Sequence, residues 1–335
     1  MNRYKLGITY ALPSFKPELE RDIMKGVADV VVTDRAITTE DAILDFARDA
    51  NALLLGSTEP VTRRVMENMP NLMALARHGI GVDNIEIEAA TSMGIVVINH
   101  PDYGLDEVAD HALALSLALT RRVVKLDRMM REGNSGQALK ETVEPIHGNS
   151  SLTFGLLGLG NIARRVATRA RAFGFRVVSY DPWVPRAEFG LIGVEKLSSL
   201  GELLETSDVI SVHVPLIPET RHMLGEKEFA QMKKSALIVN TSRGPVIDQD
   251  ALYRALSTGG IAGAGLDVYE IEPLPADHPL RRLDNVILTP HMAGYAQESE
   301  NRLRADITHA VLDVLNGKRP ELIFNPKVWE HRAIH

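Results

Sequence analysis

Three side chains of the kinds that bind anions and transfer protons each follow a short apolar run in the second half of the chain. Arg243 lies in NTSRGP, Glu272 in LDVYEIEP and His291 in TPH. An arginine can hold a carboxylate through two parallel hydrogen bonds, and a histidine can exchange a proton near neutral pH. A carboxylate hydrogen-bonded to a histidine favours the imidazolium form and orients the ring. Together, these side chains would suit a site that binds a small anion and moves a proton.

Each of these residues also has a purely structural interpretation. Arg243 could cap a helix or pair at the surface, Glu272 could be a solvated loop residue, and His291 could close a turn. Their shared position favours a common site, because the strand ends at one edge of a doubly wound sheet converge on the ligand crevice. We therefore predict Arg243, Glu272 and His291 as catalytic residues.

A glycine-rich turn predicts a nucleotide site beside them. Leu152–Leu157 is a short apolar run without polar alternation, as in a strand buried on both faces, and Gly158-Leu-Gly160-Asn-Ile-Ala163 then opens a helical pattern. Gly158 would permit a tight turn, and Gly160 would let the backbone approach a pyrophosphate at the helix N-terminus. Asp181 ends the next strand about 20 residues on, where a carboxylate binds the ribose hydroxyls and repels a 2′-phosphate. The pattern predicts NAD rather than NADP, although an ordinary βαβ turn is the alternative.

Length and composition limit the other functions open to the chain. A chain of 335 residues suggests two domains, and a net charge of −7 argues against a nucleic-acid surface. The lack of cysteine excludes a disulfide, a thiolate nucleophile and a cysteine metal site, and we predict no metal. The N-terminus lacks a signal-peptide core, and no apolar run is long enough to cross a bilayer. We expect a cytoplasmic protein that binds neither membrane nor nucleic acid.

Short apolar runs alternate with helical patterns over the first hundred residues. The alternation predicts a parallel sheet with helices on both faces, which is one small doubly wound α/β domain. The predicted strands are Leu6–Tyr10, Val30–Val32, Ala52–Leu55, Leu72–Ala76 and Ile95–Ile98, and the predicted helices are Glu18–Val27, Thr39–Arg48, Thr62–Asn68 and Ile85–Met93.

A second α/β domain is predicted around the glycine turn. Between the two domains, Asp106–Met130 is predicted as one long helix that could cross between domains or form a dimer interface. His111 within it is interpreted as a buried structural residue. Beyond the glycine turn, the predicted strands are Arg176–Tyr180, Val209–Val212, Leu237–Asn240, Ala262–Leu266 and Val286–Leu288, and the predicted helices are Glu226–Lys233 and Asp248–Ser257.

Two further loops follow predicted strands and leave their function open. In the segment Arg77–Asn84, Gly79 and Gly81 would let backbone N–H groups point at an anion, but a plain tight turn explains them equally well. In the segment that begins at His213, Pro215 could pack against an adenine, and simple loop punctuation is an equal alternative.

The same blocks give the chain a resemblance to a known family, and the match covers nearly its whole length. The chain resembles the D-isomer-specific 2-hydroxyacid dehydrogenases, and PDYGLDEVADHALAL is similar to the branch with the C-terminal binding proteins and their bacterial enzyme relatives. The matching blocks are RHGIGVDNIEIEAATSMGIVVIN, GLLGLGNIARRVATRARAFGFRVVSYDP, SDVISVHVPLIPETRHML, ALIVNTSRGPVIDQDAL, GAGLDVYEIEPLP and NVILTPHMAG.

The resemblance implies a role for each candidate residue. Arg243 would bind the substrate carboxylate and carbonyl, His291 would donate or accept the proton, and Glu272 would be its partner. The backbone N–H groups of Ile80 and Gly81 would also bind the substrate carboxylate. A further set would hold the cofactor, namely Asn161, Ile162, Asp181, Thr241 and Asp267, and it joins Gly158, Gly160 and Pro215, which the loops themselves suggest as cofactor contacts.

The resemblance also implies a discontinuous domain arrangement. Residues 1–100 with 292–335 would form a flavodoxin-like substrate domain, and residues 101–291 a Rossmann NAD-binding domain, with a cleft between them. Ser299–Asn316 would pack on the first domain, and the expected assembly is a homodimer through the helix around Asp106–Met130.

The expected function is therefore an NAD-dependent oxidoreductase acting on a small 2-keto or D-2-hydroxy acid. Gly56 stands where phosphoglycerate-specific members tend to have an arginine, which makes 3-phosphoglycerate a poorer candidate. The sequence after His291 is Met-Ala-Gly294, without the tryptophan associated with the C-terminal binding proteins, which weakens a corepressor-like interpretation. The alternatives are an NAD-sensing interaction protein without turnover and a dehydrogenase of another small anion, such as phosphite.

Overall fold

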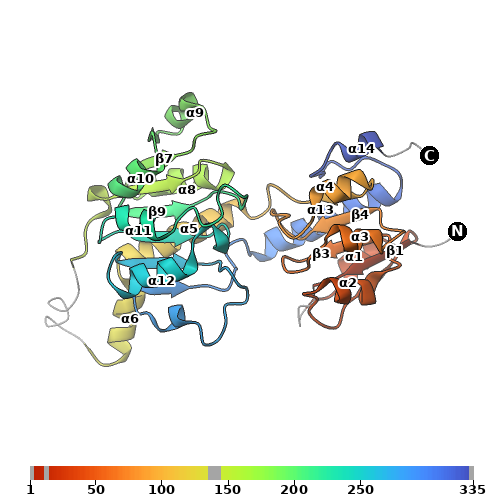
Figure 1. Cartoon of the computed structure of the whole chain (residues 1–335), viewed down its shortest axis with the longest axis horizontal. Helices are drawn as coiled ribbons and strands as arrows, with labels where there is room; N and C mark the ends of the chain where they lie inside the picture. Colours follow the sequence, from red (N-terminus) through yellow and green to blue (C-terminus); the bar gives the residue numbers. More distant parts are fainter. Residues whose placement is uncertain (1–3, 11–14, 135–144, 332–335) are drawn as a thin grey trace. The chain divides into compact units, whose positions relative to one another are not determined.

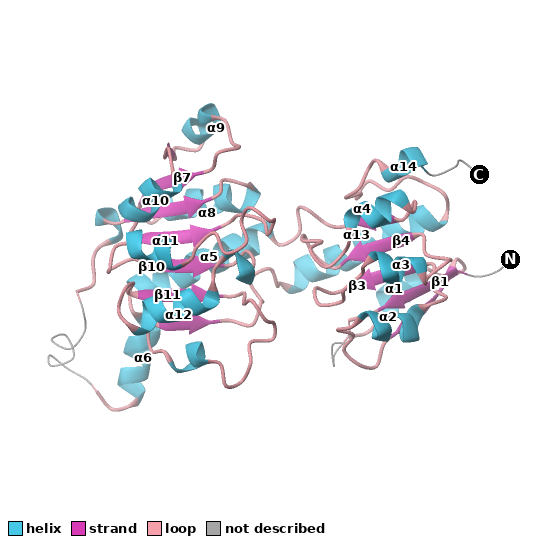
Figure 2. Ribbon diagram, in the orientation of Figure 1, coloured by secondary structure: helices cyan, strands magenta, loops and turns pink. Residues whose placement is uncertain are grey.

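The computed structural model describes residues 4–10, 15–134 and 145–331. The chain divides into two compact units: unit 1 is Met1–Tyr103 with Ala296–His335, and unit 2 is Gly104–Tyr295. Each unit, taken by itself, contains one parallel sheet with helices on both faces (Figure 1, Figure 2). The predicted α/β class with two doubly wound parallel sheets is confirmed.

Unit 1 has a five-stranded sheet in the order β2-β1-β3-β4-β5, which is the flavodoxin-like order. The strand order reverses between β1 and β3, so a ligand is expected at the carboxyl ends of these strands. The strands are β1 (Tyr4–Ile8), β2 (Ala28–Val32), β3 (Ala52–Leu55), β4 (Ala74–Arg77) and β5 (Val96–Ile98).

Alternating side chains of the unit 1 strands fill two separate cores. In β3, Leu53 and Leu55 pack with one cluster and Ala52 and Leu54 with the other, and all four are fully buried. Burial of each leucine contributes about 1.5–3 kcal/mol. The first core lies under α2 (Glu40–Ala47), α3 (Arg63–Glu67) and α4 (Ile87–Ser92), and the second under α1 (Glu18–Ile23), α13 (Gln297–Leu315) and α14 (Val328–His331).

Unit 2 has a seven-stranded sheet in the order β12-β11-β10-β9-β6-β7-β8. This is the Rossmann order with one more strand, and it reverses between β6 and β9. The strands are β6 (Thr153–Leu157), β7 (Arg176–Tyr180), β8 (Glu195–Lys196), β9 (Val209–Val212), β10 (Leu237–Asn240), β11 (Gly263–Leu266) and β12 (Val286–Leu288).

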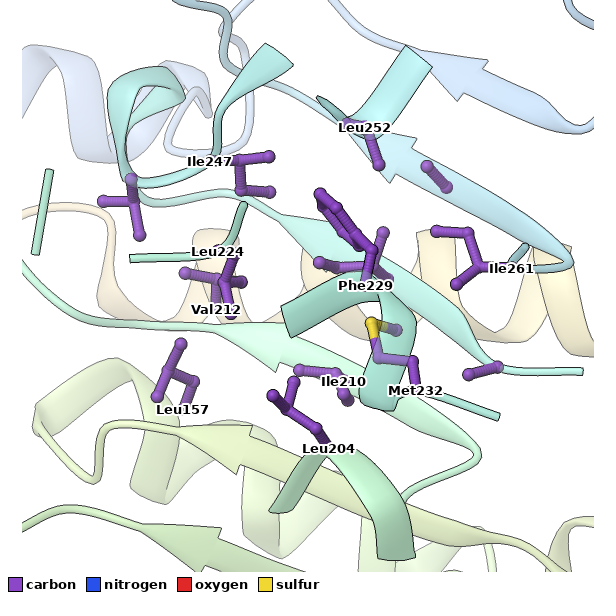
Figure 3. Close-up of a cluster of buried hydrophobic side chains, with 14 of the residues drawn as sticks. Leu157, Leu204, Ile210, Val212, Leu224, Phe229, Met232, Ile247, Leu252 and Ile261 are labelled. Carbon is purple, nitrogen blue, oxygen red and sulfur yellow. The ribbon is translucent and has the colours of Figure 1, made fainter. Parts of the chain in front are cut away.

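Helices cover both faces of the unit 2 sheet. One face packs against α5 (Leu105–Thr120), α8 (Asn161–Ala172) and α9 (Arg186–Leu191). The other face packs against α10 (Leu200–Thr206), α11 (Glu226–Gln231) and α12 (Gln249–Ser257). Figure 3 shows this second core, where Met232 at the end of α11 lies near the strand residue Ile210, and Val212 lies near Leu224. The two covered faces leave the loops at the strand ends as the place where polar side chains can gather.

The expected single helix over Asp106–Met130 is wrong. The structure has α5 and then α6 (Val123–Arg131), and the chain turns at Arg122, whose φ is 56°. Leu119 near the end of α5 is buried against the sheet, whereas α6 buries none of its residues. The helix is interrupted where the sheet beneath it ends, which the apolar periodicity did not indicate.

Among the described residues, no helix combines the length and hydropathy needed to span a bilayer.

Candidate active site

His291 and Glu272 are hydrogen-bonded to each other at the carboxyl end of the unit 2 sheet. His291 Nδ1 lies 2.6 Å from Glu272 Oε2, and the backbone N–H of Tyr269 donates to Glu272 Oε1 at 3.0 Å. Because a carboxylate only accepts, Nδ1 carries the proton in this pair, and Nε2 is left to exchange a proton with a ligand. The two side chains are 36% and 24% exposed, so the pair is open to a small ligand.

The turn that carries His291 is held by the buried carboxylate of Asp267. His291 has a φ of 55°, a conformation that is costly for a residue with a side chain. Its N–H donates to the backbone oxygen of Asp267 at 2.8 Å, and the Asp267 side chain accepts from the N–H groups of Met292 and Ala293 at 3.0 and 2.8 Å. Asp267 is fully buried, so these bonds replace its lost hydration.

Tyr269 connects the segments that carry Glu272 and His291. Its hydroxyl donates to the backbone oxygen of Thr289 at 2.8 Å. Burial raises the pKa of Tyr269 to about 12, so the hydroxyl remains a donor at neutral pH. Sequence reasoning did not predict this residue, and its position inside LDVYEIEP is the only signal that could have drawn attention to it.

Arg243 lies in a loop that packs directly against the Tyr269 backbone. Asn240, the last residue of β10, donates from Nδ2 to the Arg243 oxygen at 2.9 Å, and the Arg243 guanidinium donates to the Ser242 oxygen at 2.7 Å. A β-carbon on Gly244 would lie 1.9 Å from the carbonyl atoms of Tyr269, so only glycine fits there. The structure thus brings the segments that carry Arg243, Glu272 and His291 to one edge of the unit 2 sheet.

The glycine turn between β6 and α8 has the geometry of an anion site. Gly158 has a φ of 93°, and a β-carbon there would lie 3.1 Å from the His213 oxygen. Gly160 is the N-cap of α8, and a β-carbon on it would meet no atom of the described part of the chain within 4 Å. Asn161 and Ile162 are the first residues of α8, so their backbone N–H groups have no acceptor within the helix and lie at its positive end.

Asp181 is fixed beside this turn by three backbone donors. Its Oδ2 accepts from Leu159 at 2.8 Å, and its Oδ1 accepts from Trp183 at 2.9 Å and Val184 at 3.2 Å. The carboxylate is therefore part of the glycine turn and cannot move away without breaking these bonds. Its free lone pairs can accept from ribose hydroxyls, whereas a 2′-phosphate would meet a fixed negative charge.

The residues after β9 and β10 complete the set predicted for a cofactor. Thr241 Oγ1 is buried and has no hydrogen-bond partner among the residues that the structure describes, as expected where a ligand supplies it. His213 Nε2 lies 2.8 Å from Ser211 Oγ, and burial lowers the pKa of His213 to about 4, so the ring is neutral at pH 7. Pro215 is exposed two residues further on. The buried Thr241 hydroxyl, the N-terminus of α8 and the fixed Asp181 carboxylate together fit the groups of a dinucleotide.

Ile80 and Gly81 lie in unit 1, in the loop after β4. The Arg77 guanidinium donates to the His78 oxygen within this loop, and Asn99 Nδ2 donates to the Ile80 oxygen at 2.6 Å. Gly79 has a φ of 140°, and a β-carbon on it would lie 2.8 Å from the Arg77 guanidinium. The loop is thus held in one conformation at the carboxyl edge of the unit 1 sheet.

Comparisons with known proteins agree with this architecture. Residues 113–293 match the family model of the NAD binding domain of D-isomer specific 2-hydroxyacid dehydrogenases. The chain is 41% identical over 300 residues to a glyoxylate reductase from Korarchaeum cryptofilum, covering 89% of this chain and 90% of that protein. It is 39% identical over 308 residues to a D-3-phosphoglycerate dehydrogenase from Methanocaldococcus jannaschii, covering 92% of this chain but 58% of that protein.

A solved structure gives the same result for the fold. The crystal structure of a glyoxylate reductase from Paecilomyes thermophila superposes with a TM-score of 0.84 at 27% identity, covering 98% of this chain and 100% of that one. Both the family model and the relatives extend across the glycine turn and the segments with Arg243, Glu272 and His291. The chain therefore belongs to the family of D-isomer specific 2-hydroxyacid dehydrogenases.

Proposed function

We propose that this protein is an NAD-dependent oxidoreductase that interconverts a small 2-keto acid and its D-2-hydroxy acid. The observation that carries the proposal is the His291–Glu272 pair, at 2.6 Å, on the same sheet edge as the glycine turn and Asp181. In this proposal, residues 101–291 bind the cofactor, and residues 1–100 with 292–335 contribute the substrate contacts of Ile80 and Gly81.

The proposed mechanism assigns one task to each charged side chain. The chemistry that a bound nicotinamide supplies is hydride transfer to or from C2 of the substrate. During reduction, His291 donates a proton from Nε2 to the carbonyl oxygen, and Glu272 stabilises the imidazolium that precedes this step. Arg243 binds the substrate carboxylate and polarises the carbonyl through its planar fork of donors. During oxidation, His291 accepts the hydroxyl proton instead.

A buried carboxylate in unit 1 supports a substrate without a phosphate tail. Glu59 follows β3, is 1% exposed, and accepts from Thr9 Oγ1 at 2.8 Å and from the N–H of Gly56 at 3.0 Å. A β-carbon on Gly56 would lie 3.0 Å from both carboxylate oxygens of Glu59, so a side chain at position 56 would displace this carboxylate. Near the switch point between β1 and β3, Glu59 thus supplies a negative charge, and Gly56 has no side chain that could supply a positive one. This arrangement disfavours a substrate with a doubly charged phosphate tail.

The matched substrates D-glycerate and D-3-phosphoglycerate test both parts of this proposal. With NAD⁺, we expect turnover of D-glycerate and a kcat/KM at least about 10-fold lower for the phosphorylated acid, because like charges repel at the tail. In the reverse direction, glyoxylate, pyruvate and hydroxypyruvate are assayed with NADH and NADPH. A lack of turnover of every one of these acids with both cofactors would contradict the dehydrogenase proposal. NAD-driven dimerisation without turnover would favour the NAD-sensing alternative. A preference for the phosphorylated acid would contradict only the proposal that the substrate has no phosphate tail.

The cofactor preference for NAD is assigned to Asp181. Asp181→Asn keeps one acceptor oxygen of similar shape but removes the negative charge, so we expect the NADH to NADPH ratio of kcat/KM to fall about 10- to 100-fold. Initial rates with each cofactor measure the ratio. Glu188→Gln, on the neighbouring α9, serves as a control for loss of one nearby carboxylate. An unchanged ratio in Asp181→Asn would remove this residue from cofactor selection.

We also propose a homodimer, and α6 supports it. This helix buries none of its residues, and Val123, Val124 and Met130 are 54%, 41% and 57% exposed. We expect wild-type protein to elute with twice the chain mass of 36.9 kDa in light scattering, and Val124→Glu with Met130→Glu to shift it to one chain mass. Phe173→Glu, an equally exposed apolar residue at the end of α8, should leave the mass unchanged. A wild-type monomer would contradict the proposal.

A further inference from the structure

His111 of α5 contacts the turn that carries His291 by way of Thr289. Its Nε2 lies 3.0 Å from Thr289 Oγ1 and 3.7 Å from Asp267 Oδ1. The neighbouring residues Ala112 and Leu115 of α5 are buried in the core that packs against the sheet, which fixes the place of the ring. The His111 side chain is 26% exposed, whereas Asp267 is fully buried. The contact therefore links the buried face of α5 to the turn that carries His291.

The numbers of donors and acceptors determine the direction of these hydrogen bonds. The backbone N–H groups of Met292 and Ala293 can only donate, so Asp267 accepts from both. Thr289 has a single hydroxyl proton, which it gives to Asp267 Oδ1 at 2.5 Å. The Thr289 oxygen can then only accept, so His111 Nε2 carries a proton and donates it. The chain of bonds runs from His111 through Thr289 to Asp267.

Each donor in this chain stabilises a negative charge that has lost its water. The same carboxylate holds Met292 and Ala293, the residues directly after His291, and thereby keeps His291 in its left-handed conformation. Hydrogen bonds in series polarise one another, so loss of the outermost donor weakens the bond between Thr289 and Asp267. The effect of His111 would therefore reach the proton-transferring ring without contact between the two histidines.

We propose that His111 is a positioning residue, which fixes the orientation of His291 through Thr289 and Asp267. This inference rests on the proposed function for its kinetic consequence and gives Asp267 a role in the His291 turn beyond the cofactor contact predicted for it. The hydrogen bond that matters is the one that His111 Nε2 donates to Thr289. A replacement side chain that can still donate to Thr289 should therefore keep His291 in its orientation.

The experiment compares His111→Leu, which removes the donor, with His111→Gln, whose amide can still donate to Thr289. For His111→Leu, we expect kcat to fall about 10- to 100-fold, the effect of a small misplacement of a catalytic group. The dissociation constant of NADH, measured by fluorescence titration, should stay within about 2-fold. His111→Gln should restore kcat to within about 3-fold of wild type. In the His291→Ala background, His111→Leu should cause no further loss, because it acts through the missing ring.

A measurement that needs no turnover accompanies the kinetics. Hydrogen exchange of the Met292 and Ala293 amides should be faster in His111→Leu and unchanged in His111→Gln, because these amides are bonded to Asp267. The matched control is His278→Leu, which removes another partly buried histidine of unit 2 whose Nε2 lies 2.9 Å from Gln249. This control should lower stability without changing kcat or the exchange of these two amides.

The outcomes separate this inference from the proposed function. Unchanged exchange and unchanged kcat in His111→Leu would overturn the positioning role, as would an equal loss in the His291→Ala background or a matching rise in the NADH dissociation constant. A wild-type protein without turnover on any 2-keto acid would contradict the proposed function alone, and the exchange measurement would then decide the positioning role.

Discussion

Replacement of His291 by alanine lowers kcat for 2-keto acid reduction by about two to four powers of ten, the usual contribution of a positioned acid–base group. The reason is the geometry of the pair: Nδ1 is held by Glu272 at 2.6 Å, which leaves Nε2 as the proton donor. The NADH dissociation constant should change little, because the glycine turn and Asp181 lie on other strands. Steady-state rates with glyoxylate, together with fluorescence titration of NADH, measure the two quantities separately.

His278→Ala provides the control for the loss of an imidazole from the same unit. His278 accepts from the Leu280 N–H at 3.3 Å, so its removal costs local hydrogen bonds but no proton donor at the site. We expect its kcat to equal that of the wild type. A His291→Ala enzyme within about 3-fold of the wild-type kcat would exclude His291 as the acid–base group.

Replacement of Arg243 by alanine should lower kcat/KM by about two to four powers of ten. Two charge-assisted hydrogen bonds to the substrate carboxylate and carbonyl would be lost, each of which contributes about 1.5–3 kcal/mol. Arg243→Lys keeps the charge but not the planar fork, so its loss should be intermediate. Addition of free guanidinium should partly restore Arg243→Ala, and initial rates at several guanidinium concentrations measure this recovery.

Arg254→Ala, at an exposed position on α12, tests whether the loss of any arginine has the same effect. It should retain wild-type kcat/KM. If Arg243→Ala also retained it, the substrate anchor would have to be sought elsewhere on the sheet edge.

The fold could be predicted from the sequence where apolar runs are short and bounded by polar residues. The strands Val209–Val212, Leu237–Asn240 and Val286–Leu288 were predicted to the residue. The two-residue β8 and the helices α9 and α10, of six and seven residues, were missed because none is long enough to repeat its apolar pattern over several periods. For α10 a signal was present, since Ser199 accepts from the Glu202 N–H at 3.1 Å, the arrangement that Ser-x-x-Glu indicates.

The candidate site was predictable to the level of residue type and strand end. The pairing of His291 with Glu272 followed from a histidine and a carboxylate after neighbouring strands. The bonds from Asp267 to Met292 and Ala293, and the close approach of Gly244 to Tyr269, depend on how two loops pack. No local pattern encodes such packing, so the supports of the site could be found only in three dimensions.

The placement of α13 has a consequence for biosynthesis. Leu303, Ile307, Val311 and Val314 of this helix cover one face of a sheet whose strands all lie within the first hundred residues. While the ribosome is still translating unit 2, that face has no such cover, and its apolar side chains remain exposed for the seconds that synthesis takes. The nascent amino-terminal strands are thus a natural client for a chaperone until α13 emerges.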